Sequence, residues 1–256
     1  MRAAAAHPLW VTVEHYVVLA RETPSPGELG VVSPSPATAV GITAGDDVAQ
    51  STKFSPNEVS AGLVTFDEVT VAVVADAHYG PEPSERLVPC LTNAPTSWSA
   101  DNPADKAALP ALTERCVAPL EAHWTDVAPI SPTLLKAATS DTVVRWMSVG
   151  DPSLFLIANE DMRRLNRYRP DFLERPRRHS QSPYDDGEIA LRGGQGVLLA
   201  TDGIEEQCSG LAPADIACEL SGGRASTAPL ARLFDRAGLT HHRGGGDNLA
   251  AVSVTL

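Results

Sequence analysis

Three aspartates that lie where apolar, strand-like runs end or begin constrain this 256-residue chain more than any other feature. One run ends at Asp76 and a second at Asp202, whereas Asp247 leads into a third run that closes the sequence. Aspartate is depleted in strands and is costly to bury unless it is paired, hydrogen-bonded or bound to a cation. Three such carboxylates from distant segments therefore predict a metal site.

The short strings around these aspartates follow one another in a definite order and spacing. From the N-terminus they are Ala75-Asp76-Ala77-His78-Tyr79-Gly80, Val149-Gly150-Asp151, Ala200-Thr201-Asp202-Gly203 and Gly244-Gly245-Gly246-Asp247-Asn248. Through them, residues 40–256 resemble the metal-dependent protein phosphatases (PPM), the type 2C serine/threonine class, as a divergent, bacterial-type member.

The order of the expected elements favours two packed sheets. Strands come first, helical periodicity runs from Pro83 to about Trp124, and the later strands and helices do not repeat as regular βαβ units. We therefore expect an α+β fold, a four-layer α-β-β-α sandwich with two central, mainly antiparallel β-sheets, which is the architecture of the resembled family. Residues 142–149 and 153–158 are expected to pair as a hairpin about Gly150-Asp151-Pro152. Helices are expected at 212–220 and 227–237.

The N-terminal part reads as an addition to a single domain. Residues 8–20 alternate like an edge strand, and a Pro/Ser/Gly-rich loop follows from Pro24 to Pro36. We therefore expect residues 1–36 to form an N-terminal strand and Pro/Ser-rich linker, and residues 37–256 to form the type 2C phosphatase-like domain.

The resemblance implies a centre with two Mn²⁺ or Mg²⁺ ions and a weaker third. Asp76 would bridge two ions, the carbonyl of Ala77 would bind the first, and Asp202 and Asp247 would hold the second. Asp151 matches the position that helps to bind the third. A water that bridges both ions would attack phosphorus, because metal binding lowers the pKa of water from 15.7 toward about 7.

Two residues are the expected catalytic groups. Asp76 would hold both ions at the attacking water. His78, two residues further on, would protonate the departing serine or threonine oxygen, a role suited to a group that titrates near pH 6.5. The alternative interpretation of His78 is a structural histidine, and that of the three aspartates is unrelated turn or cap residues.

The chain departs from the resembled pattern in the first acidic string and upstream of it, where many members carry a phosphate-binding arginine. The first acidic string reads Asn57-Glu58-Val59, with an aliphatic residue where most members carry a carboxylate, and Glu58 is the candidate that would partly replace this metal-shell group. Lys53 is the cation nearest to the usual phosphate-binding arginine, and a lysine lacks the bidentate fork of a guanidinium.

Three functions remain open at this point. The first is a phosphatase that hydrolyses phosphoserine or phosphothreonine in proteins. The second is a pseudophosphatase, which binds a phosphoprotein or regulatory partner and turns over poorly because of Val59. The third is a metal-dependent hydrolase of small phosphate esters.

Composition narrows the partners and the location. Twenty basic against thirty-two acidic residues give a net charge of −12, which disfavours nucleic acid and anionic membrane surfaces. No stretch is long enough to span a bilayer. A basic island from Arg163 to Arg178 could receive a phosphorylated protein, although a solvated loop is the alternative.

Cysteines without Cys-x-x-Cys spacing suggest no disulfide framework and a reducing, cytoplasmic setting; they are Cys90, Cys116, Cys208 and Cys218. We expect a monomer.

Overall fold

The computed structural model describes most of the apolar runs. The described residues are 13–25, 28–35, 37–45, 55, 57–66, 69–78, 80–93, 111–113, 115–116, 130–138, 143–159, 161–167, 184–204, 213–221, 229–234 and 247–256.

Two six-stranded sheets make up the centre of the molecule. Sheet A has the order β1-β4-β5-β6-β7-β10, formed by Val13–Val18, Val59–Phe66, Val69–Ala77, Ile130–Ala138, Val143–Ser148 and Asp185–Ala190. Sheet B has the order β2-β3-β12-β11-β8-β9, formed by Leu29–Ser35, Thr38–Thr43, Leu249–Thr255, Gln195–Ala200, Ser153–Ala158 and Asp161–Arg164. All neighbouring strands are antiparallel.

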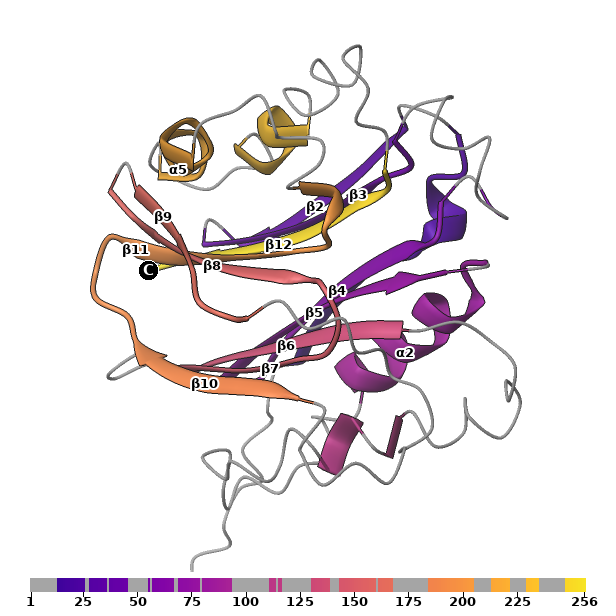
Figure 1. The fold of residues 1–256 in the computed structure, drawn as a ribbon, viewed down its shortest axis with the longest axis horizontal. Helices are drawn as coiled ribbons and strands as arrows, with labels where there is room; N and C mark the ends of the chain where they lie inside the picture. The colour runs from indigo at the N-terminus through magenta and orange to yellow at the C-terminus, as the bar shows by residue number, and fades with distance from the viewer. Residues whose placement is uncertain are drawn as a thin grey trace, which may run out of the picture.

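Helices cover the outer face of each sheet (Figure 1). Helix α2 (Glu82–Asn93) packs on sheet A together with helical residues 111–113 and 115–116. Helix α5 (Pro213–Ser221) and helical residues 229–234 pack on sheet B. The layers are therefore helix, sheet, sheet and helix, which confirms the expected α-β-β-α sandwich. Helix α5 also confirms the helix predicted at 212–220.

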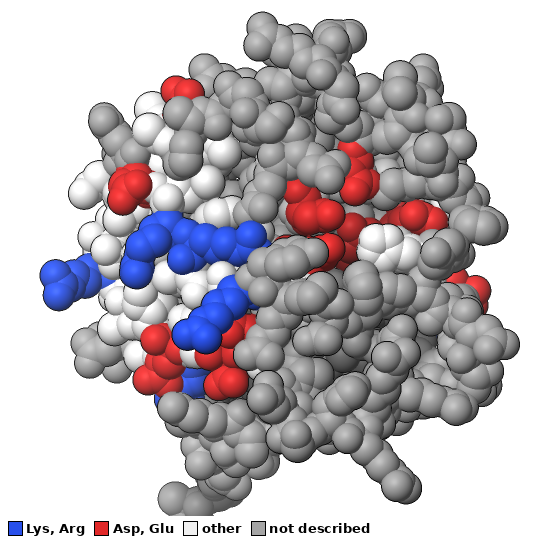
Figure 2. Space-filling model, viewed as in Figure 1, with Lys and Arg blue, Asp and Glu red and all other residues white. Residues whose placement is uncertain are grey.

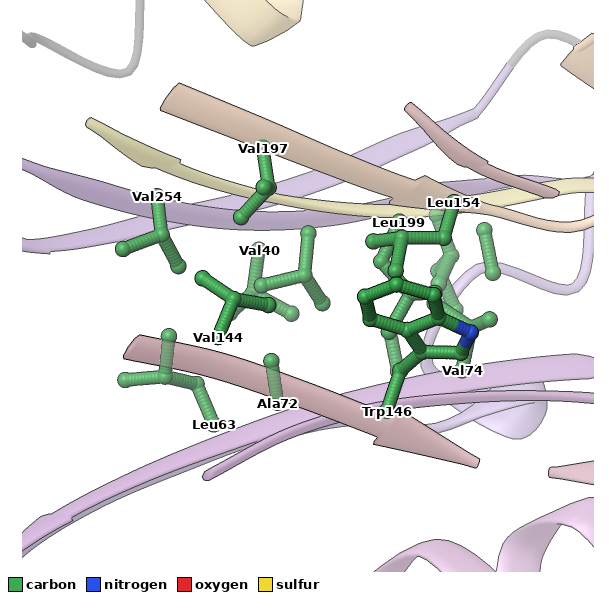
Figure 3. Close-up of a cluster of buried hydrophobic side chains, with 14 of the residues drawn as sticks. Val40, Leu63, Ala72, Val74, Val144, Trp146, Leu154, Val197, Leu199 and Val254 are labelled. Atoms are coloured by element: carbon green, nitrogen blue, oxygen red, sulfur yellow. The ribbon is translucent and has the colours of Figure 1, made fainter. Parts of the chain in front are cut away.

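The apolar runs are almost continuous because both faces of the central strands are buried. In β5, Ala72 and Val74 point toward sheet B, whereas Val71, Val73 and Ala75 point to the other face and pack in the cluster that includes α2. Figure 3 shows side chains of both sheets meeting in the layer between them, with Trp146 from β7 against Leu154 from β8. This alternation places Asp76, two residues after Val74, on the face of β5 that looks toward sheet B.

The hairpin expected about Gly150 is wrong. Strands β7 and β8 form at 143–148 and 153–158, but β7 pairs with β6 and β10 in sheet A, and β8 pairs with β11 and β9 in sheet B. The Gly150-Asp151-Pro152 turn is thus a crossover between the sheets. A turn signal marks where the chain changes direction but not whether the next strand stays in the same sheet.

Asn166 holds this crossover in place. Its buried Nδ2 donates to Ser148 Oγ at 3.0 Å and to the Pro152 carbonyl at 2.6 Å, and its Oδ1 accepts from the Leu154 amide at 2.8 Å. One side chain therefore bonds the end of β7, the turn and the start of β8, which fixes the turn that carries Asp151.

The N-terminal strands belong to the two sheets. β1 pairs with β4 along its length, from Val13 opposite Phe66 to Val18 opposite Ala61, and it is an edge strand as expected. A single 3₁₀ turn follows (η1, Ala20–Glu22), and β2 then pairs with β3 in sheet B. The chain thus crosses from sheet A to sheet B within residues 19–28.

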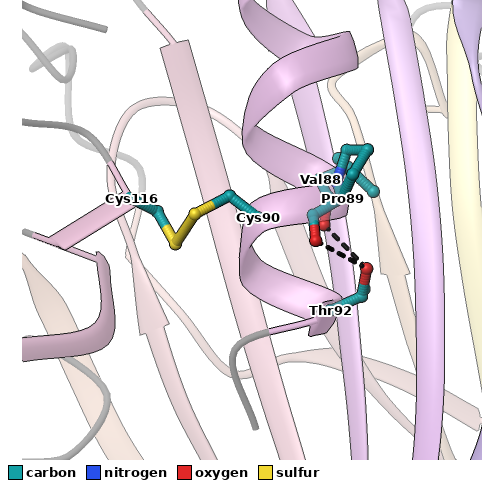
Figure 4. Close-up of a disulfide and its surroundings, with 5 residues drawn as sticks. All are labelled: Val88, Pro89, Cys90, Thr92 and Cys116. Atoms are coloured by element: carbon teal, nitrogen blue, oxygen red, sulfur yellow. Dashed lines mark hydrogen bonds between the residues drawn. A yellow bond between two sulfur atoms is a disulfide. The ribbon is translucent and has the colours of Figure 1, made fainter. Parts of the chain in front are cut away.

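Cys90 and Cys116 are paired as a disulfide, contrary to the expectation from their spacing. The bond joins α2 to the helical residues 115–116 (Figure 4). Sequence spacing did not reveal it because the two cysteines are brought together only by packing of both segments on sheet A. Cys218 on α5 is an exposed free cysteine.

Within the described residues, no helix combines the length and the apolar character needed to cross a bilayer.

Candidate metal centre

Asp76, Asp202 and Asp247 meet at one point although they are far apart in the sequence. One carboxylate oxygen from each lies within 4.8 Å of the others. Asp76 is 1% exposed, and the other two are half-buried. The structure thus brings together the three aspartates that the strand-end pattern selected.

Strand pairing explains the meeting. β11 and β12 are antiparallel neighbours with Ala200 opposite Ala251, so the residues just after β11 and just before β12 lie at the same end of this strand pair. The Thr201 amide donates to the Ala250 carbonyl at 2.9 Å, and the Ala250 amide donates to Thr201 Oγ1 at 3.0 Å. These bonds continue the pairing up to Asp202, while Asp76 reaches the same point from sheet A.

A close backbone approach also brings Asp202 to Asp247. A Cβ built on Gly203 would overlap the carbonyl oxygen of Asn248 and lie 3.4 Å from the Leu249 Cα. Only glycine permits this approach between the residue that follows Asp202 and the residue that follows Asp247.

Asn248 connects the centre to its surroundings and was not selected by the sequence analysis. Its buried side chain donates to the Ala44 carbonyl at 2.5 Å and accepts from the Glu58 amide at 3.0 Å, and its own amide donates to Asp247 Oδ1 at 2.7 Å. It therefore links the segment that carries Asp247 to the ends of β3 and β4. The sequence shows a polar residue directly before a mostly apolar strand, but it does not show the distant groups that this residue bonds.

The carboxylates of this cluster could hold a cation. Two carboxylates about 4 Å apart repel by about 4 kcal/mol at an effective dielectric constant of about 20, and burial adds a desolvation cost. Carboxylate oxygens are the ligands that hard divalent cations prefer. The donor set therefore fits Mg²⁺ or Mn²⁺.

Asp151 lies beside the cluster. Burial raises the pKa of its carboxyl, the charge of Asp247 raises it further, and the Asp151 amide, His78 and Arg164 lower it. Its Oδ1 is buried with no hydrogen-bond partner in the described part of the chain. Arg164 at the end of β9 donates from Nη2 to the Asp151 carbonyl at 3.2 Å. The Asp151 carboxyl thus lies close enough to an imidazole, a guanidinium and the Asp247 carboxylate to interact with all three electrostatically.

The remaining predicted site residues lie next to Asp76. Ala77 is the last residue of β5, and it does not adopt the positive φ that would require glycine. His78 follows and is partly exposed. Glu58 is 3% exposed rather than solvated, and its Oε1 accepts a 2.6 Å hydrogen bond from the Gly80 amide. Lys53 and the island residues from Arg169 to Arg178 lie outside the described residues.

Gly203→Ala is predicted to weaken metal binding. The added Cβ must push the Asp202 turn away from Asn248, which separates two of the three carboxylates. We expect the dissociation constant for Mn²⁺ in calorimetry to rise at least about tenfold, as for loss of groups that orient ligands. Gly193→Ala is the control, because a Cβ there meets nothing within 4 Å. Unchanged affinity in Gly203→Ala would contradict the close-approach argument.

Asp151→Asn is predicted to stabilise the metal-free protein at neutral pH. Because the folded pKa of Asp151 is raised, its contribution to stability is present below the ordinary aspartate pKa and is lost as pH rises through the raised value. The amide removes this loss, so Tm without metal should exceed that of the wild type at pH 7. The difference should vanish below about pH 3.9. A lower Tm for the variant at pH 7 would contradict the prediction.

No family model matches the sequence, and no curated protein matches it. Solved structures do match. RsbX in complex with magnesium is 15% identical with a TM-score of 0.59, covering 88% of this chain and 98% of that one. The PPM Ser-Thr phosphatase MsPP from Mycobacterium smegmatis is 14% identical with a TM-score of 0.58, covering 88% and 100%. The catalytic domain of the serine/threonine phosphatase PstP, in complex with two manganese ions, is 12% identical with a TM-score of 0.57, covering 96% and 98%.

These identities are low, so the likeness concerns the fold. It agrees with the resemblance drawn from the aspartate strings, and the chain has the fold of the PPM-type protein phosphatases.

Proposed function

We propose that this protein is a metal-dependent phosphatase that hydrolyses phosphoserine or phosphothreonine in proteins. The observation that carries the proposal is the meeting of Asp76, Asp202 and Asp247 within 4.8 Å, at the ends of central strands of the two sheets of a phosphatase fold. An arrangement of three convergent carboxylates is costly in a protein that binds no cation there.

The proposed cofactors are two Mn²⁺ or Mg²⁺ ions and a weaker third. Asp76 and the Ala77 carbonyl would hold the first ion, Asp76, Asp202 and Asp247 the second, and Asp151 would help to hold the third. The magnesium and manganese in two structures of the same fold support this choice of ions. Glu58 stays a candidate for the metal shell through its carboxylate.

When bound, such ions lower the pKa of a water and supply the nucleophile for attack on phosphorus. The protein residues then have two tasks. The aspartates fix the geometry of the attack, and His78, which is partly exposed two residues beyond Asp76, would give its proton to the departing serine or threonine oxygen. The electrostatic interaction of His78 with Asp151, which lowers the pKa of that carboxyl, supports a place for His78 at the same centre.

Basic side chains next to the centre support a phosphorylated protein as the substrate. Figure 2 shows acidic side chains gathered near the middle of one face, with arginine side chains to one side of them. Arg163 and Arg167 are exposed, and Arg164 bonds the Asp151 carbonyl. Guanidinium groups bind phosphate and carboxylate through paired hydrogen bonds, so this part of the surface suits an anionic peptide.

A pseudophosphatase is the second candidate, and Val59 is the observation that favours it. Val59 lies directly opposite Asp76 in the β4–β5 pair and is fully buried between the sheets. Side chains in such a pair have Cβ atoms about 5 Å apart. A carboxylate is therefore missing from a position adjacent to the proposed bridging residue.

Three further expectations accompany the proposal. The protein would act as a monomer, and its net charge of −12 disfavours nucleic acid and anionic membranes as partners. A cytoplasmic location remains a prediction, but the Cys90–Cys116 disulfide removes the support that it drew from the cysteines, since disulfides are rare in a reducing compartment.

Manganese titration into metal-free protein, with hydrolysis measured on the same samples, tests the proposal. We expect Mn²⁺ binding and release of phosphate from a phosphoserine peptide. Asp76→Asn should bind Mn²⁺ at least about 100-fold more weakly and lose turnover. Preference for a small aryl phosphate over the peptide would instead favour the small-ester hydrolase. Absence of Mn²⁺ binding by the wild type would defeat the proposal, and binding without turnover would favour the pseudophosphatase.

Val59→Asp separates the enzyme from the pseudophosphatase. The new buried carboxylate faces Asp76, so we expect the metal-free variant to lose about 3 kcal/mol of unfolding free energy and Mn²⁺ to restore it. If the metal shell is impaired in the wild type, affinity for Mn²⁺ and turnover both rise in the variant. If Glu58 already compensates, both stay close to the wild-type values. Val59→Asn is the matched control without the charge.

A further inference from the structure

Residues 19–23, which we call the N-terminal strap, pack against the start of β4 and the residues just before it. The strap contains η1 and links β1 of sheet A to β2 of sheet B. Ala20 and Thr23 are 1% and 2% exposed. The Ala20 amide donates to Ser60 Oγ at 3.3 Å, so the strap contacts β4 just after the Asn57-Glu58-Val59 string.

Thr23 fixes Asn57 at the start of that string. Asn57 Nδ2 donates to Thr23 Oγ1 at 2.8 Å and to the Thr23 carbonyl at 3.3 Å. Asn57 Oδ1 accepts from the Val59 amide at 3.2 Å. The Asn57 side chain is 2% exposed, so these contacts are made away from water. Together they define the path of the backbone on both sides of Glu58.

Glu58 in turn holds both ends of the segment that contains His78. Its backbone carbonyl accepts from the Ala77 amide at 3.3 Å, and its Oε1 accepts from the Gly80 amide at 2.6 Å. Gly80 has φ 126°, a conformation that other residues rarely adopt. A carboxylate that accepts a backbone N–H makes a charge-assisted bond, which is stronger than a neutral one. Glu58 therefore brackets His78 from both sides.

A second buried path joins the strap to the same carbonyl. Ser60 Oγ and Ser84 Oγ are 3.1 Å apart, and Ser84 Oγ donates to the Glu58 carbonyl at 2.7 Å. Three consecutive hydrogen bonds between buried groups thus connect Ala20 to the Glu58 carbonyl, through Ser60 and Ser84. In contrast, the Arg21–Glu85 ion pair is exposed on the arginine side and contributes little.

We propose that Glu58 is a positioning residue for the His78 segment, and that the N-terminal strap, through Thr23 and Asn57, holds Glu58 in that role. This inference rests on the proposed function for its effect on turnover, but the hydrogen bonds that carry it do not depend on metal. The strap would then support the reactive centre, and a change in the strap would alter that centre without contacting it.

Amide hydrogen exchange in the metal-free protein tests the inference independently of activity. Thr23→Val keeps the shape of the side chain and removes the Oγ1 acceptor. We expect the Gly80 amide to exchange about tenfold faster in this variant, as for loss of one buried hydrogen bond, while amides in the middle of β5 keep their protection. Thr23→Ser should restore the wild-type rate. Arg21→Ala, which breaks only the exposed ion pair, should leave the Gly80 amide unchanged.

Kinetics with Mn²⁺ and the phosphoserine peptide give the second readout. We expect Thr23→Val to lower kcat about tenfold with little change in KM, because His78 acts on the leaving group rather than on binding, and Thr23→Ser to recover it. An unchanged Gly80 exchange rate in Thr23→Val would overturn the inference. An equal rise for Gly80 and the β5 amides would also overturn it, because the strap would then stabilise the whole domain. Failure of the proposed function is seen separately, as a wild type without turnover.

Discussion

Mutual repulsion of three carboxylates is the constraint on which the rest of the structure depends. Asp76, Asp202 and Asp247 are held within 4.8 Å, and no segment of the chain would adopt that arrangement alone. The free energy that holds them together comes from the packing of sheet A on sheet B, through an apolar layer that includes Trp146 and Leu154. Burial of that layer stabilises the fold and at the same time fixes the carboxylates where a divalent cation can join them.

Much of the centre could be predicted because its signals are local. An aspartate at the end of an apolar run is visible in sequence, and the three selected in this way do meet. Asn248 and Asn166 could not be selected, since their roles come from buried hydrogen bonds to segments that only the fold brings near. Asn248 bonds the Glu58 amide from 190 positions away. The number of sheets was predicted by element order, whereas the Gly150 turn was misassigned because a crossover and a hairpin share one turn signal.

The two residues of the first acidic string, Glu58 and Val59, have different structural roles. Val59 places an aliphatic side chain opposite Asp76 and adds to the apolar layer between the sheets. Glu58 retains a carboxyl group, and its Oε1 accepts a hydrogen bond from the Gly80 amide in the segment beside Asp76. The region around Asp76 therefore combines a hydrogen-bonded backbone with an apolar residue opposite the aspartate.

Anomalous diffraction from crystals grown with Mn²⁺ tests the central claim most directly, because it locates the ion without relying on turnover. Data collected on both sides of the manganese absorption edge identify the metal among the surrounding atoms. The account predicts anomalous peaks between the carboxylates of Asp76, Asp202 and Asp247, with Asp76 shared by two ions about 3.5 to 4 Å apart. Manganese bound only elsewhere, or the three carboxylates moved apart with no peak between them, would contradict it.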